Sequence, residues 1–202
     1  MDNVKKPLYS LIPLEDFKAL MGIDDREDKT ARFCLVTSTF SIEQYCKRRL
    51  LRKKHFERIE FIGDTFIPLK EYPVSNVLAV YAVTSKSGVG EIVEPDFYSI
   101  VPDCGTYEDI PFSISFTRAL LRYRGLYDIK AVYWAGYSSG NVPPDLASAC
   151  LELASWNMNR YRGRRVGMTG NVRGTGRDAE HFEMSMPENV RSLLEPYRRK
   201  VI

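Results

Sequence analysis

The sequence predicts an α+β fold in which an antiparallel β-lobe is inserted into a helical part. Apolar residues recur at helical spacing near both ends of the chain, whereas they alternate between His55 and Tyr137. The alternating segments follow one another without helices between them, which favours an antiparallel sheet or a small sandwich. We expect an N-terminal helical part over residues 1–52, a β-lobe over 53–137 and a C-terminal helical part over 138–202. The two helical parts are expected to pack as one domain.

Two helices are predicted before the β-lobe. The first spans Pro13 to Met21, because proline suits a helix start, acids follow it and Gly22 ends it. The second begins after Asp24, which we interpret as a capping residue with Glu27 three positions later. It runs to about Arg48, and its core stripe is Ala31, Cys34, Leu35, Ser38, Ile42 and Tyr45.

The β-lobe is predicted to contain about six strands. They are rich in β-branched and aromatic residues and most end at Gly, Pro, Asn or Asp. The predicted segments are residues 55–63, 65–74, 76–84, 97–103, 112–123 and 127–137. Glycines in residues 85–91 and 122–128 permit positive φ, so both stretches are interpreted as hairpin turns. The aromatic residues are expected to fill the core of the lobe and its sheet edges.

The helical pattern returns after Pro143 and Pro144, which fit a helix start with Asp145 at its positive end. The predicted core stripe of this long helix is Leu146, Ala149, Cys150, Leu153, Ala154 and Met158. A glycine-rich loop over residues 160–178 follows it. The stretch MPENVRSLLEPYRRKVI then predicts a last short helix.

Charge is the main functional signal. The formal net charge is only +3, but residues 160–177 hold six arginines and no acid, and the stretch PYRRK adds three cations. Such a local basic region suits contact with phosphate or with an acidic partner. The candidate contact residues are Arg160, Tyr161, Arg162, Arg164, Arg165, Arg173, Arg177, Tyr197, Arg198, Arg199 and Lys200.

Catalytic and cofactor motifs are missing from the sequence. The loop has glycines but lacks the Lys-Ser/Thr of a phosphate-binding loop, and it follows a helix, not a strand. The two histidines, His55 and His181, are far apart, and there is no GxSxG or HExxH motif. The cysteines form no CxxC pair and are interpreted as reduced and mostly buried; they are Cys34, Cys46, Cys104 and Cys150. We therefore expect no enzyme activity, no metal and no cofactor.

Three stretches, in their order, resemble the head–tail connector proteins of tailed bacteriophages, also called head completion or adaptor proteins. They are LIPLEDFKALMGIDDRED from Leu11, YWAGYSSGNVPPDLASACLELASW from Tyr133, and SLLEPYRRK from Ser192. The stretch LKEYPVSNVLAVY from Leu69 is also similar to the first β-hairpin of that family. Together they cover both helical parts and the edges of the β-lobe.

The resemblance implies a non-catalytic structural subunit of the virion at the head–tail interface. Family members form a ring, typically of about twelve copies, between the portal protein and the tail or head-closure protein. The ring passes DNA through its channel. No stretch of 18 apolar residues and no signal peptide are present, so we expect assembly in the host bacterial cytoplasm and no membrane partner.

Two other functions are compatible with the sequence. A free nucleic-acid-binding module would use the six loop arginines on phosphates, and six such contacts give a log–log salt slope of roughly −5 on duplex DNA. A small-molecule enzyme is the second of these alternatives. The connector interpretation predicts instead that the basic loop and the PYRRK stretch act at an assembly interface or face DNA.

Overall fold

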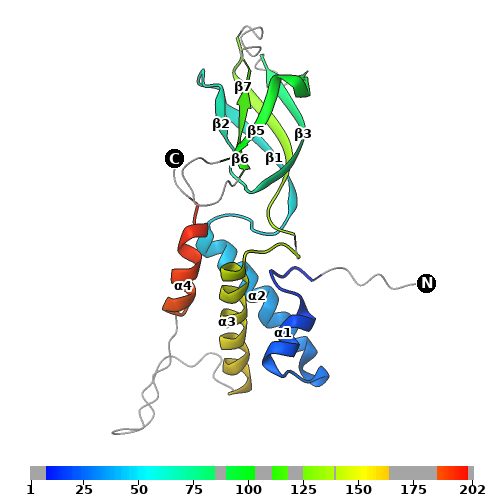
Figure 1. Ribbon diagram of the computed structural model, residues 1–202, viewed down its shortest axis with the longest axis vertical. Coiled ribbons are helices and arrows are strands. Elements are labelled where there is room, and N and C mark those ends of the chain that lie inside the picture. Colours follow the sequence, from blue (N-terminus) through cyan, green and yellow to red (C-terminus); the bar gives the residue numbers. More distant parts are fainter. Residues whose placement is uncertain are drawn as a thin grey trace, which may run out of the picture. The chain divides into compact units, whose positions relative to one another are not determined.

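The computed structural model describes residues 8–84, 90–102, 111–117, 125–138, 140–163 and 186–199. Its helices and two antiparallel sheets confirm the predicted α+β fold (Figure 1). The chain divides into a helical unit, residues 1–48 with 139–202, and a β unit, residues 49–138. Each unit is described by itself.

The helical unit has four α-helices in its described part. They are α1 Leu14–Met21, α2 Asp28–Cys46, α3 Pro144–Arg162 and α4 Glu188–Leu194, with 3-10 turns η1 Asp25–Glu27 and η4 Glu195–Tyr197. The first helix ends as its sequence predicts, because Gly22 adopts a left-handed φ of 59° and its N–H returns to the Lys18 carbonyl. Proline precedes the first turn of α1, α3 and α4 alike.

The centre of this unit is the antiparallel pair α2 and α3. The Asn157 amide donates to the Ser38 hydroxyl at 3.0 Å, and Thr39 Oγ1 lies 3.8 Å from the Cys150 sulfur. The predicted α3 stripe is fully confirmed as buried, and so is the α2 stripe apart from Tyr45, which is half-buried. Helix α4 packs on α3 and closes the core with Val190 and Leu194.

The predicted cap of the second helix is wrong. Neither Asp24 nor Glu27 makes a side-chain capping hydrogen bond, and a 3-10 turn precedes α2. The Glu27 N–H that the Asp24 side chain would cap donates instead to the Asp24 backbone carbonyl at 2.9 Å, and the Glu27 carboxylate binds Arg162. A charge-assisted bond to a guanidinium or ammonium competes with a bond to a backbone N–H.

The described part of the β unit has seven strands in two sheets. They are β1 Lys53–Glu60, β2 Phe66–Pro68, β3 Val74–Val83, β4 Gly90–Val93, β5 Tyr98–Pro102, β6 Pro111–Phe116 and β7 Asp128–Ala135, with the 3-10 turn η2 Pro95–Phe97. The strand orders are β1-β7-β3-β4 and β2-β6-β5, all antiparallel. Side chains of both sheets, such as Val80, Ile129 and Ile114, share one core.

Two details of the β unit differ from the sequence prediction. Strand β4 was not predicted, because GEIV is only four residues long and begins with glycine. The hairpin expected over residues 122–128 is wrong, because β7 pairs with β1 and β3 whereas β6 belongs to the other sheet. The chain therefore crosses between sheets there, and the described Gly125 has the positive φ, 73°, that was expected. The expected continuation of the β6 strand over 118–123 and the expected turn over 85–89 lie outside the described residues.

The two ends of the β unit lie side by side. The Tyr137 N–H donates to the Leu50 carbonyl at 2.7 Å, and the Arg52 N–H donates to the Tyr137 carbonyl at 2.9 Å. Gly136 has φ 98°, and a Cβ added there would lie 2.7 Å from the Leu50 and Leu51 carbonyl oxygens. Glycine is therefore required where the outgoing chain passes the incoming one.

Candidate functional site: two basic clusters on the helical unit

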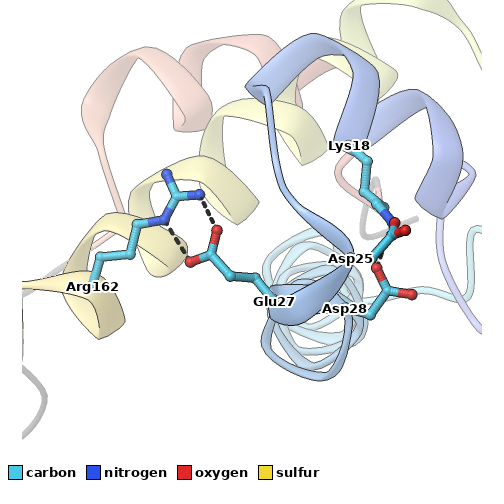
Figure 2. A network of polar contacts seen from close by, with 5 residues as sticks. All are labelled: Lys18, Asp25, Glu27, Asp28 and Arg162. Carbon is cyan, nitrogen blue, oxygen red and sulfur yellow. Dashed lines mark hydrogen bonds and ion pairs between the residues drawn. The ribbon is translucent and has the colours of Figure 1, made fainter.

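The first cluster lies where α3 ends and the basic loop begins. The Arg162 guanidinium donates from Nε to Glu27 Oε1 at 3.0 Å and from Nη2 to Oε2 at 2.6 Å (Figure 2). This bidentate geometry joins the last residue of α3 to the turn before α2. The hydrogen bond from Arg162 lowers the pKa of Glu27, so the pair is charged at neutral pH.

A second ionic group stabilises the same corner. The Lys18 ammonium of α1 lies between the carboxylates of Asp25 and Asp28 (Figure 2). Hydrogen bonds to the two acids raise the pKa of Lys18, and the bond to Lys18 lowers the pKa of Asp25. The corner from which the basic loop departs is therefore fixed by charges from α1, η1, α2 and α3.

Arg160 and Tyr161 are held by aromatic contacts. The Arg160 guanidinium lies over the Trp156 ring, 4.6 Å from its centroid, in a cation–π geometry. Tyr161 meets the Phe33 ring edge-on with centroids 5.7 Å apart. Tyr161 and Phe33 both remain exposed, so this aromatic pair is available to a partner on the surface of the unit.

The second cluster lies where α4 ends. Tyr197 is buried, and its hydroxyl donates to Asp145 at the start of α3. Arg198 donates to Glu195 at 3.0 Å and lies over the Tyr45 ring, while the backbone N–H of Arg199 donates to the Cys46 carbonyl at 2.9 Å. The Tyr45 hydroxyl completes the cluster with a 2.9 Å bond to Glu195, which raises the pKa of that tyrosine.

These clusters lie at opposite ends of the helical unit. Arg162 lies beside the start of α2, whereas Arg199 lies beside its end. A 19-residue helix makes 18 rises of about 1.5 Å, so the clusters are separated by about 27 Å. The sequence had placed all these cations in one basic quarter of the chain. Arg164, Arg165, Arg173, Arg177 and Lys200 lie outside the described residues.

Other chemistry has little support in the described residues. Burial raises the pKa of the thiols of Cys34, Cys46 and Cys150 to about 11, so they are protonated and unreactive at neutral pH. The expected burial is thereby confirmed for these three, while Cys104 lies outside the described residues. Across the described ranges no cluster of three or more His, Cys, Asp or Glu side chains has the geometry of a metal site.

None of the described helices combines the length and apolar character needed to cross a bilayer.

Sequence reasoning missed one surface of the β unit. Aromatic residues were expected to fill the core and sheet edges, and Tyr133 and Phe116 are indeed buried. Phe56, however, lies on the outer face of the sheet with its ring exposed. The alternation of Lys54, Phe56 and Arg58 within β1 is the signal that could have located it, because alternate residues share one face.

Comparison with known proteins first defines the class of fold. An antiparallel helix pair with a two-sheet β unit inserted between its helices is a fold that this chain shares with solved neck chains of phage-like particles. Neither a family model nor a curated protein sequence matches the chain.

Solved structures of a gene transfer agent particle share this fold with the chain. One is described as the neck of a native gene transfer agent particle computed with C12 symmetry; it is 19% identical, with a TM-score of 0.57 over 100% of this chain and 97% of that chain. The neck of the empty particle, computed with C6 symmetry, is 20% identical, with a TM-score of 0.57 over 95% and 91%. A chain from the virion of the native particle is 20% identical, with a TM-score of 0.57 over 100% and 96%. At this identity the likeness shows the fold, and it agrees with the connector resemblance in the sequence.

Proposed function

We propose that this protein is a structural subunit of the neck of a phage-like particle, where it joins head to tail. The supporting observation is the likeness to neck chains, including one solved with C12 symmetry that matches over 100% of this chain and 97% of its own length. The subunit then forms a closed ring of about twelve copies, because repeated head-to-tail contacts close when the rotation between neighbours divides a full turn. The ring binds the portal protein on one side and a tail or head-closure protein on the other.

The two basic clusters fit this function as contacts at two levels of the neck. The Arg162 cluster and the basic loop are proposed to reach one partner or the DNA in the channel, and the Tyr197–Lys200 stretch is proposed to reach the other partner. Arg160 and Arg162 already have partners in the chain, in Trp156 and Glu27. The proposal assigns contact with an external phosphate or carboxylate to Arg164, Arg165, Arg173 and Arg177, which lie outside the described residues.

The test is assembly with the portal protein of the same particle. Native mass spectrometry of the mixture should give a complex containing a fixed multiple of the 23.2 kDa subunit. When this protein is absent, the particle's heads should package DNA but fail to join tails. A chain that stays monomeric with its portal, together with normal tail joining in its absence, would contradict the proposal.

A variant set separates the connector from a free nucleic-acid-binding module. Replacing Arg164, Arg165, Arg173 and Arg177 by Gln removes four candidate contacts and leaves the ion pair and cation–π contact of α3 intact. If the isolated monomer binds duplex DNA through these four arginines, its log affinity falls with log salt concentration with a slope of about −3.6, and the variant loses this salt-dependent binding. The connector proposal predicts weak binding by the monomer and a defect of the variant in assembly with portal or tail. The control is Arg26→Gln, an exposed arginine at the turn before α2.

A further inference from the structure

The outer face of the sheet β1-β7-β3-β4 is unusually apolar. In an antiparallel sheet with one face on the core, the other face ordinarily carries polar side chains. Here Phe56 of β1 is 67% exposed, Ile92 of β4 is 63% exposed and Leu78 of β3 is 45% exposed. Val132 of β7 lies opposite Phe56 in the register. Exposed apolar side chains that gather on one face of a sheet mark an interaction surface.

Register and a β-bulge bring these side chains together. Phe56 pairs with Val132, and Val132 pairs with Ala79 across β7 and β3. The register shift between Val77 and Ala79 adds Leu78 to the strand at this point. Val77 packs against the core whereas Leu78 is exposed, so the bulge presents a leucine beside the Phe56 row. Ile92 of β4 lies opposite Tyr81, which shares a face of β3 with Ala79, so the patch extends over four neighbouring strands.

The rim of this patch is basic. Exposed Lys54 lies opposite Trp134 in the next row, and the Arg52 guanidinium lies 5.6 Å from the centroid of the same tryptophan ring. Lys130 lies opposite both Arg58 and Tyr81, in the same row of the sheet as Ile92, so this row also carries cations. A partner of this face should thus be apolar at its centre and acidic around it.

The β1–β2 loop of the same chain has this complementary chemistry. Ile62 at its tip is 80% exposed and Asp64 beside it is exposed. The loop is held at both ends, because the Phe61 N–H donates to the Tyr127 carbonyl at 2.8 Å and the Phe116 N–H donates to the Thr65 carbonyl at 2.7 Å. Gly63, with φ 100°, makes the turn between Ile62 and Asp64. An isoleucine beside a carboxylate is thus presented on an anchored turn, which reduces the entropy lost on docking.

We propose that the Ile62–Asp64 tip of one copy docks on the Phe56–Leu78–Ile92 face of the next copy. Two different patches then meet, which is the heterologous contact that a ring requires. Ile62 contacts the apolar patch beside Phe56, and Asp64 faces the basic rim near Lys54. The inference rests on the proposed ring function and assigns the contact between neighbouring β units.

The experiment measures self-association of the full chain by sedimentation equilibrium. Phe56→Ser and Ile62→Ser are expected to raise the dissociation constant at least tenfold while leaving the folded fraction unchanged, since both side chains are exposed. The matched control is Leu20→Ser, which alters an apolar residue of α1 that is 68% exposed and should change nothing. Lys54→Glu and Asp64→Lys should each weaken association, and the double variant should recover most of it.

Several outcomes would overturn this contact. Association that is unchanged by Phe56→Ser and Ile62→Ser would exclude it, and so would a wild-type chain that stays monomeric at all concentrations. If Lys54→Glu and Asp64→Lys do not compensate each other in the double variant, Lys54 of one copy does not face Asp64 of the next. Portal binding is measured in parallel on the same variants. If the variants weaken self-association but the wild-type chain does not bind the portal, the proposed neck function is wrong and the inferred contact stands. If Phe56→Ser forms the portal complex with unchanged stoichiometry, the inferred contact is wrong and the neck function stands.

Discussion

Glu57 is a buried carboxylate whose charge is compensated from three directions. It accepts hydrogen bonds from the Tyr133 hydroxyl at 2.7 Å and from the Lys70 N–H at 3.0 Å, and the Lys70 ammonium lies 3.8 Å away. These bonds attach the segment after β2 to strands β1 and β7. A buried charge of this kind is tolerated only while its bonds are complete.

Removing one of these donors should therefore be costly. Tyr133→Phe keeps the ring volume but deprives Glu57 of its buried donor, and we expect a loss of about 1–3 kcal/mol in the free energy of unfolding. Urea denaturation of the purified protein measures it. Tyr127→Phe, at an exposed tyrosine of the same unit, is the matched control and should stay within about 0.5 kcal/mol. Equal effects of the two variants would contradict a specific contribution from the Glu57 bond.

His55 makes the stability of the β unit depend on pH. Its ring stacks on the ring of Tyr133. Burial lowers the pKa of His55 from 6.5, and the charges of Lys53 and Arg49 lower it as well, whereas the charge of Glu57 raises it. The unfolded chain therefore binds a proton at higher pH than the folded chain does. The neutral histidine's contribution is complete above about pH 6.5 and is lost as pH falls through the lower, folded pKa.

The expected result is a falling unfolding midpoint between pH 7.5 and pH 5.5. His55→Gln should flatten the dependence in this window, and His181→Gln reports separately on the second histidine. The acids Asp25 and Glu27, whose pKa values are lowered by Lys18 and Arg162, act only below about pH 4.5. A midpoint that rises toward pH 5.5 would show that the sign assigned to His55 is wrong.

At the scale of elements, the helices were the most predictable part. Periodic burial in α3 and the Pro and Gly signals around α1 are local properties of the sequence, and the structure confirms both. The partition of strands into two sheets was not accessible in this way, because pairing of β7 with β1 and β3 depends on contacts distant in sequence. The Arg162–Glu27 pair was hidden for the same reason: its residues are 135 positions apart.

Glycine at the exit from β7 gives a test at this scale. Gly136→Ala combines a positive φ with a Cβ only 2.7 Å from backbone atoms, so it should cost more than the roughly 1–3 kcal/mol of a strained backbone position. Gly63→Ala also has a positive φ but has open space around it, and should show the strain alone. Gly140→Ala, with open space and no positive φ, should be close to neutral. The thermal unfolding midpoint should therefore be lowest for Gly136→Ala, intermediate for Gly63→Ala and highest for Gly140→Ala. Equal stability of Gly136→Ala and Gly140→Ala would show that the expected clash does not occur.

For the whole molecule, the sequence predicted one basic region, and folding divides it. Only Arg160, Tyr161 and Arg162 of the loop candidates are described, and each of them contacts α2, α3 or η1. The second group, around Tyr197 to Arg199, lies at the other end of the α2–α3 pair. A sequence pattern records which charges are present, whereas their separation depends on the direction in which the antiparallel helices run.

The β unit should fold when it is separated from the rest of the chain. Its own core contains residues of both sheets, and its ends are hydrogen-bonded to each other between Leu50 and Tyr137. A fragment of residues 49–138 is expected to unfold cooperatively and to give a dispersed amide NMR spectrum. A fragment that lacks cooperative unfolding would contradict the proposal that this unit is an independent domain.

Helices α2 and α3 have equal lengths of 19 residues, and this equality has a geometric consequence. The Arg162 contact lies at one end of this pair and the Arg199 contact at the other, so the length of the pair sets the distance between these two contacts. Lengthening α3 alone would move Arg162 away from Glu27. Only a matched insertion in both helices, in multiples of about seven residues to preserve the buried stripes, would change the spacing and keep the contacts.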